Sequence, residues 1–352
     1  DRLTHSSAAP LVSCLAYSFC SISMVLANKA IVGYMDFHLP FSLALFQNAV
    51  AFMVVHVAKS NGLIEAEPLR IPIAQQWFPV TAVFTAMLLT SFLSLQYLAV
   101  PMVTIFKNLT NVLIVTGDFY YYGHQVSNGA VGALSLMTIG AVLAGWYDLS
   151  FSALGYAWMT ANCASTAAYV LLLKKVVHSV KLSRFGMVYY NNGLSLPFLL
   201  LLAAGSGELN RYAETPVMSQ LSFWLLIVFS GSVGFCLSLA SLWCVKATSP
   251  TTYSIVGALN KIPLTVLGIT MFNVPVTRES VIFITLGLAG GMVYSYQKHT
   301  EEQAARREAE AAKAADAAGA ITPFPRTPTP DDRDEERGAE MVATAKNGGL
   351  VP

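Results

Sequence analysis

Charged side chains are scarce in this sequence. Asp, Glu, Lys and Arg make up 12% of its 352 residues, against an average of about 25% in soluble domains. Hydrophobic residues make up 55%, and the mean hydropathy is +0.55. This composition excludes an ordinary soluble domain and predicts a protein that crosses a membrane several times. The net charge of +1, with no stripe of basic and aromatic residues, gives no sign of nucleic-acid binding.

The sequence also lacks the motifs of metal sites, disulfide frameworks and intramembrane enzymes. Its five cysteines lie within apolar runs and form no CxxC pair, so we interpret them as packing residues. There is no HExxH motif, no pair of aspartates within an apolar run and no convincing Ser/His pairing. We therefore expect no enzymatic activity, no metal and no cofactor. A receptor or scaffold that binds a ligand without moving it is a further class that these absences leave open.

Ten apolar runs are long enough to cross a bilayer as helices, which takes about 20 residues each. Most of the connections between them are short. The expected spans are 11–33, 39–58, 77–99, 101–121, 128–147, 153–177, 185–204, 221–245, 251–272 and 279–297. The predicted fold is therefore an all-α membrane protein with about ten transmembrane helices.

The basic residues of the connections predict the orientation in the membrane. An even number of spans places both termini on one side. The connections on that side carry most of the basic residues, namely Lys59, Arg70, Lys174, Lys175, Lys181, Arg184, Lys246 and Lys298. The opposite connections carry only Arg211 and Arg278. By the positive-inside rule, we expect both termini in the cytosol.

The two halves of the chain resemble each other. In the fourth span, Pro101 and Asn111 are ten residues apart, and Pro250 and Asn260 in the ninth span repeat this spacing 149 positions later. A second match, at an offset of 145, joins the ends of the first and sixth spans. Repeats of five spans insert in opposite directions. We therefore predict an inverted repeat, which places a transport site at the repeat interface near the middle of the membrane.

These observations divide the chain into four parts. Residues 1–10 form a cytosolic segment, residues 11–147 the first five-helix repeat and residues 153–297 the second. The tail, residues 298–352, is expected to be cytosolic. Its first part is rich in Ala, Glu and Arg and is predicted to continue the last helix, whereas the later part is rich in proline and charge and is predicted to be disordered.

Two lysines within apolar spans are the sharpest candidates for function. Lys107 lies in the fourth span and Lys261 in the ninth, where an ammonium group costs about 2.5 kcal/mol or more to insert. No acidic residue lies deep in any span. Two ammonium groups near the middle of the membrane suit a ligand with two negative charges, such as a diphosphate. The alternative is a structural lysine that pairs with carbonyl groups. Lys29 lies nearer the non-cytosolic end, where a gating role and simple snorkelling to the interface are both open.

A second polar cluster lies in the seventh span, where Asn191 and Asn192 follow Tyr189 and Tyr190. An amide side chain offers both donors and an acceptor, which suits the edge of a nucleobase, and neighbouring aromatic rings can stack on the face of the base. Hydrogen bonding between helices explains such asparagines equally well. The sequence leaves these two interpretations open.

The ninth span carries further polar positions. Tyr253, Gly257 and Lys261 are four residues apart and share one face of a helix, and Asn260 lies beside them. A glycine lets a ligand approach the backbone, while the hydroxyl and amide groups suit a sugar. In the eighth span, Ser238 is a small polar residue, of a kind that more often serves packing between helices.

Together these motifs resemble those of the Golgi GDP-mannose transporters. Residues 249–261 are similar to their GALNK region, and residues 189–192 are similar to their FYNN motif, with Tyr189 in place of the usual Phe. Residues 98–110 match their fourth-span signature. The similarity extends over residues 10–297 and leaves the tail outside it.

The resemblance implies the drug/metabolite transporter fold and a location in the Golgi membrane. It implies exchange of cytosolic GDP-mannose for lumenal GMP by alternating access. The roles it implies are guanine binding by Asn191, Asn192, Tyr190 and Ser238, sugar and ribose binding by Tyr253, Gly257, Ala258 and Asn260, and phosphate binding by Lys107 and Lys261.

The alternative is a transporter of the same fold for another GDP-sugar, a UDP-sugar or a sugar phosphate. The asparagine pair argues against a sugar phosphate, which has no base to recognise. The expected partners are GDP-mannose, GMP and the surrounding membrane lipid, with no nucleic acid. Association into an oligomer is left open by the sequence.

Overall fold

The computed structural model describes residues 9–123, 126–177, 179–248 and 250–319, and they form an all-helical protein. Each expected span is helical. The continuous helices are α1 (Ala9–Lys29, extended by the π-helical turn η1, Ala30–Tyr34), α2 (Pro40–Ser60), α3 (Ile71–Tyr97), α6 (Asn128–Trp146), α7 (Ala153–Val177), α8 (Arg184–Gly205), α9 (Leu221–Ala247) and α12 (Arg278–Gly319). Eight of the helical segments among the described residues are long and apolar enough to cross a membrane, which confirms the membrane fold.

The fourth and ninth spans are each broken into two helices. The fourth consists of α4 (Val100–Phe106) and α5 (Leu109–Tyr122), and the ninth of α10 (Pro250–Leu259) and α11 (Lys261–Met271). At the first break the backbone tightens, because Asn108 N bonds to Ile105 O at 3.0 Å, three residues back. Each break carries an adjacent lysine and asparagine, so both interruptions lie where the sequence places a lysine within an apolar span.

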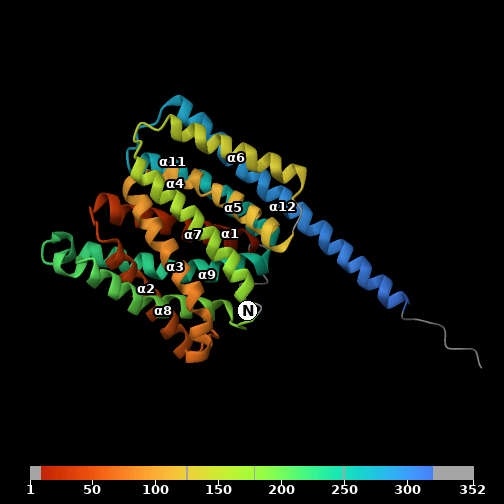
Figure 1. Cartoon of the computed structure of the whole chain (residues 1–352), viewed down its shortest axis with the longest axis horizontal. Coiled ribbons are helices and arrows are strands. Elements are labelled where there is room, and N and C mark those ends of the chain that lie inside the picture. The colour runs from red at the N-terminus through yellow and green to blue at the C-terminus, as the bar shows by residue number, and fades with distance from the viewer. Residues whose placement is uncertain (1–8, 124–125, 178, 249, 320–352) are drawn as a thin grey trace, which may run out of the picture. The chain divides into compact units, whose positions relative to one another are not determined.

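Helix packing pairs the two halves of the chain. The largest contacts between helices join α3 with α7, α1 with α9 and α2 with α8. In the proposed repeat, α1, α2 and α3 of the first half correspond to α7, α8 and α9 of the second half. The contact of α3 with α7 then corresponds to that of α9 with α1, and the contact of α2 with α8 corresponds to itself. Figure 1 shows α2 and α8 together at one edge of the bundle and α6 beside α12 at the opposite edge. The pairing agrees with a repeat, and its inverted orientation stays a prediction.

Two glutamates join α2 and α8 at both ends of this pair. The first amides of a helix have no partner within it. Glu208, in the 3₁₀ turn η2 (Glu208–Arg211) after α8, accepts from Phe41 N at 3.2 Å, Ser42 N at 2.8 Å and Ser42 Oγ at 2.7 Å. In the loop after α2, Glu67 accepts from Ser183 N at 2.8 Å and Ser183 Oγ at 2.9 Å. The loop after α8 thus caps α2, and the loop after α2 binds Ser183, the residue whose hydroxyl caps α8.

The two caps occupy corresponding positions in the sequence. Ser42 and Ser183 are separated by 141 positions, and so are Glu67 and Glu208. A buried apolar cluster seals the end of the bundle where α2 begins, with Phe37 and Phe223 in ring contact at 4.8 Å. The same end holds a second 3₁₀ turn, η3 (Pro216–Ser219), which contributes Val217 to the cluster.

The chain separates into two compact units at residue 299. Residues 1–299 contain the helical bundle and residues 300–352 the tail. The last helix continues into the second unit as far as Gly319. The disorder expected further on, and most of the expected N-terminal segment 1–10, fall outside the described residues.

Candidate functional site

A cavity of about 260 Å³ lies within the bundle, among α1, α2, α3, α7, α8 and α9. Asn191 and Asn192 on α8 and Ser238 on α9 line it, so the structure brings together three of the four residues expected at guanine. Both asparagines are buried, with 3% and 6% of their surface exposed. Much of the remaining wall is apolar, which excludes water and strengthens the hydrogen bonds formed inside.

Tyr190, the fourth residue, occupies a different environment. Its side chain is fully buried in an apolar cluster with Trp77 and does not line the cavity. Its hydroxyl donates to Pro68 O at 2.6 Å and accepts from Arg70 N at 2.9 Å. In this structure Tyr190 therefore ties α8 to the loop that precedes α3.

The cavity contains polar residues that the sequence analysis missed. Gln47 and Asn48 on α2 and Tyr169 on α7 all line it. Gln47 Nε2 donates to Asn28 Oδ1 at 3.0 Å, and Asn48 Nδ2 donates to Ser195 Oγ at 3.2 Å. The sequence did contain a signal for two of these residues, because Gln47 and Asn48 are amides within an apolar span. A buried amide needs a hydrogen-bond partner.

A second polar cluster is formed by the two helix breaks. Lys261 Nζ donates to Asn108 Oδ1, and Asn108 Nδ2 donates to Gly287 O on α12 at 3.3 Å. Lys107 is exposed, lies within electrostatic reach of Lys261, and donates no hydrogen bond among the described residues. Asn260 is 6% exposed, and its buried Nδ2 has no hydrogen-bond partner in the described part of the chain. The breaks thus gather two ammonium groups and an amide donor with unused capacity.

Three of the four expected sugar residues, Tyr253, Gly257 and Ala258, lie on α10, which leads to the second break at Asn260. The ring of Tyr253 contacts that of Tyr17 on α1, with centroids 4.7 Å apart and a tilt of 45°. A Cβ on Gly257 would meet Tyr17 Oη at 3.2 Å, so the glycine leaves room for this hydroxyl. Ala258 is half-buried beside it. Tyr17 is a further residue that the sequence analysis missed.

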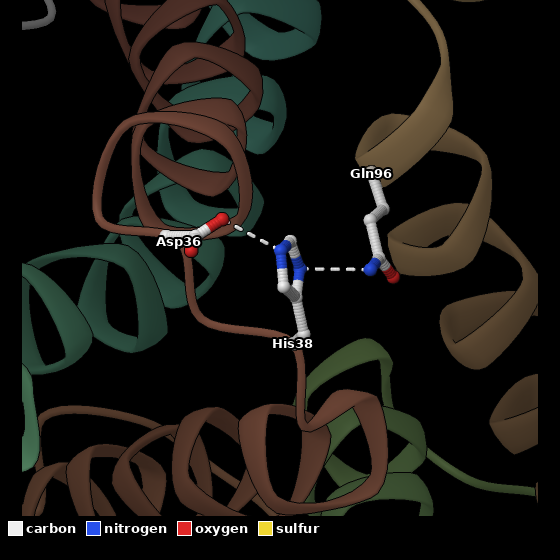
Figure 2. A network of polar contacts seen from close by, with 3 residues as sticks. All are labelled: Asp36, His38 and Gln96. Atoms are coloured by element: carbon white, nitrogen blue, oxygen red, sulfur yellow. Dashed lines mark hydrogen bonds and ion pairs between the residues drawn. The ribbon is translucent and has the colours of Figure 1, made fainter. Parts of the chain in front are cut away.

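Lys29 holds the end of α3. Its Nζ donates to Leu95 O at 2.6 Å and Leu98 O at 2.8 Å, which places a positive charge at the negative end of that helix. Nearby, His38 lies between Asp36 and Gln96, with Nε2 at 2.6 Å from Asp36 Oδ1 and Nδ1 at 2.7 Å from Gln96 Nε2 (Figure 2). The loop before α2 is therefore also joined to the end of α3.

The two clusters offer different chemistry to a ligand. The cavity presents amide and hydroxyl groups to a planar polar molecule, whereas the helix breaks present positive charge to an anion. Neither lysine is among the residues that line the cavity. Among the described residues, no group of three or more His, Cys, Asp or Glu side chains is arranged to hold a metal ion.

Comparison with known proteins gives consistent results. The profile of the Triose-phosphate Transporter family matches residues 9–295. The chain is 42% identical to the GDP-mannose transporter GONST1 of Arabidopsis thaliana over 308 residues, 86% of this chain and 92% of the relative. It is 35% identical to a GDP-mannose transporter of Aspergillus niger over 82% of this chain and 80% of the relative. A solved crystal structure covering 83% of this chain and 99% of its own has a TM-score of 0.51 at 15% identity, a likeness of fold alone.

Proposed function

The chain belongs to the Triose-phosphate Transporter family, and on that basis we propose that it exchanges GDP-mannose for GMP across the Golgi membrane by alternating access. The observation that carries the proposal is the match to GDP-mannose transporters along nearly the whole membrane portion of the chain. The two polar clusters support it, since amides lining a cavity suit a base and two ammonium groups suit a diphosphate. In this assignment Asn191, Asn192 and Ser238 contact guanine.

The remaining roles follow the geometry of the helix breaks. Lys107 and Lys261 bind the phosphates. Asn260 Nδ2, which has no partner among the described residues, donates to the sugar or ribose. Gly257 lies two residues before the end of α10, and Tyr253 lies one helical turn earlier. Lys29 is assigned to gating, because opening the bundle near the end of α3 involves breaking its two bonds to the helix carbonyls.

The proposed orientation places the end of the bundle where α8 begins in the cytosol. The excess of basic residues in the connections at that end supports this orientation. The cap formed by Glu67 is then cytosolic, and the cap formed by Glu208 is lumenal. GDP-mannose enters from the cytosol, and GMP returns from the lumen.

The two lysines at the helix breaks give a physical reason for exchange. Two ammonium groups within electrostatic reach of each other repel, and moving them uncompensated through an apolar barrier is costly. A bound nucleotide neutralises them in both directions of transport. Return of the empty carrier is therefore expected to be slow.

The test is uptake of labelled GDP-mannose into proteoliposomes preloaded with GMP, UMP or buffer. We expect rapid uptake only with GMP inside, and a loss of about ten-fold or more in Lys261→Ala, which removes a charge-assisted contact. Lys181→Ala is the matched control, because Lys181 is exposed in a loop outside the spans. Equal uptake from buffer-loaded vesicles would contradict exchange, and uptake driven equally by UMP would contradict recognition of guanine.

A further inference from the structure

Both polar atoms of the Asn191 amide bind neighbouring side chains. Trp77 Nε1 donates to Asn191 Oδ1 at 2.9 Å, and Thr81 Oγ1 lies 3.4 Å from the same oxygen. An indole N–H only donates hydrogen bonds, so the amide oxygen must face Trp77. This orients Nδ2 toward Tyr169, to whose hydroxyl it donates at 3.0 Å. The second N–H of Nδ2 has no acceptor among the described residues.

Tyr169 offers a further donor at the same wall. Its oxygen accepts from Asn191, and its own proton is donated to no group among the described residues. Its ring contacts Phe84 at 5.8 Å between centroids. Both rings line the cavity. The result is a hydroxyl donor at the cavity wall, held in place through Asn191.

Asn192 supplies an acceptor to the same cavity. Its Nδ2 donates to Val188 O at 2.8 Å, one helical turn earlier. Its Oδ1 accepts no hydrogen bond from the described residues. The neighbouring asparagines thus differ: the Asn191 oxygen is bound by Trp77, whereas the Asn192 oxygen has no partner among the described residues.

We infer that Tyr169 is a specificity-determining residue, whose hydroxyl donates to O6 of the guanine base, while Asn192 Oδ1 accepts from an N–H of the base. Asn191 orients the Tyr169 hydroxyl through one N–H of its amide and keeps the other N–H for the base. Both purines carry the acceptor N7, but guanine carries O6 where adenine carries an amino group. An O–H donor facing O6 therefore favours guanine. This inference rests on the proposed function and adds Tyr169 to the guanine contacts within it.

The experiment measures inhibition of labelled GDP-mannose exchange by four nucleotides in proteoliposomes of the full chain. These are GMP, AMP, 7-deaza-GMP, which lacks N7, and the 2-aminopurine ribonucleotide, which lacks O6 and the N1 proton. In the wild type we expect the 2-aminopurine nucleotide and AMP to inhibit at least about ten-fold more weakly than GMP, and 7-deaza-GMP to inhibit about as strongly as GMP. In Tyr169→Phe, GMP should inhibit about ten-fold more weakly, whereas the affected analogue, the 2-aminopurine nucleotide, should weaken no further.

Two more variants separate positioning from a structural effect. Asn191→Ala should lose the same discrimination between GMP and the affected analogue, and adding Tyr169→Phe should reduce it no further. Tyr190→Phe is the matched control, because its hydroxyl contacts the loop before α3 and not the cavity. It should alter inhibition by all four nucleotides equally, if at all.

The outcomes distinguish this inference from the function on which it rests. If GMP fails to inhibit exchange in the wild type, the proposed function itself fails. If GMP inhibits the wild type but Tyr169→Phe keeps the full ranking of the four nucleotides, only the role of Tyr169 is overturned. If Tyr169→Phe does not fold, Asn191→Ala decides in its place, because full discrimination between GMP and the 2-aminopurine nucleotide in that variant would overturn the role of the Tyr169 hydroxyl.

Discussion

Replacing Glu208 by alanine is expected to destabilise the whole bundle, although the residue lies in a loop. Glu208 is 5% exposed and accepts three hydrogen bonds at the first turn of α2. The N-cap residue of that helix is Leu39, which has no side-chain acceptor. The carboxylate therefore provides from another part of the chain the cap that the local sequence lacks, and its charge also complements the positive end of the helix.

The size of the effect follows from these contacts. A hydrogen bond to a charged group contributes about 1.5–3 kcal/mol, and loss of a helix cap costs about 1 kcal/mol. Because the three bonds share one carboxylate, we do not add them, and we expect Glu208→Ala to lower the free energy of unfolding by about 3 kcal/mol. At about 2–4 °C per kcal/mol, the melting temperature should fall by about 6–12 °C. Glu67→Ala should cost less, about 1 kcal/mol, because Glu67 is half-buried and solvent replaces part of its contacts.

The assay is thermal unfolding of the purified protein in detergent, with Glu214→Ala as the control. Glu214 lies six residues after Glu208 in the same loop, but it is exposed, so its replacement should leave the melting temperature unchanged. A melting temperature of Glu208→Ala within error of the wild type would refute the view that this carboxylate supports α2. A larger effect of Glu67→Ala than of Glu208→Ala would refute the dependence on burial.

Other contacts give predictions of the same kind. Asn108→Ala removes the partner of Lys261, so the KM for GDP-mannose should rise about ten-fold, and an unchanged KM would place Lys261 outside the binding site. Lys29→Met removes a cation from two terminal carbonyls of α3 and should lower the free energy of unfolding by about 2 kcal/mol; a change in exchange rate with no change in melting temperature would instead indicate gating alone. The Sγ atoms of Cys14 and Cys244 lie 3.6 Å apart, so mild oxidation should cross-link α1 to α9, which mass spectrometry of digested peptides detects and Cys244→Ser should abolish.

The fold was largely predictable because the bilayer imposes a simple rule on the sequence. Long apolar runs with few charges predicted helical spans, and each expected span is helical. The two helix breaks were not predicted, although lysine and asparagine lie at them in the fourth and ninth spans. These signals are local, since each depends on the cost of placing a given side chain in hydrocarbon and on no partner elsewhere in the chain.

The site was predictable in composition but not in arrangement. Asn191, Asn192 and Ser238 were identified, and they line one cavity. Tyr169 and Asn108 were not identified, because a tyrosine or asparagine in an apolar run has many structural explanations. Their importance appears only from their partners, Asn191 and Lys261, which lie 22 and 153 positions away in the sequence.

The sequence by itself determined that this protein is a helical membrane protein with amines and amides within its spans, because hydrophobic length and intramembrane charge act through the residue's own transfer free energy. Only the tertiary structure decided which polar groups are already satisfied and which keep a donor or acceptor for a ligand. The orientation of the Asn191 amide depends on Trp77, and the capping of α2 depends on Glu208. A hydrogen bond requires two groups at about 3 Å, and the packing of distant helices brings them together.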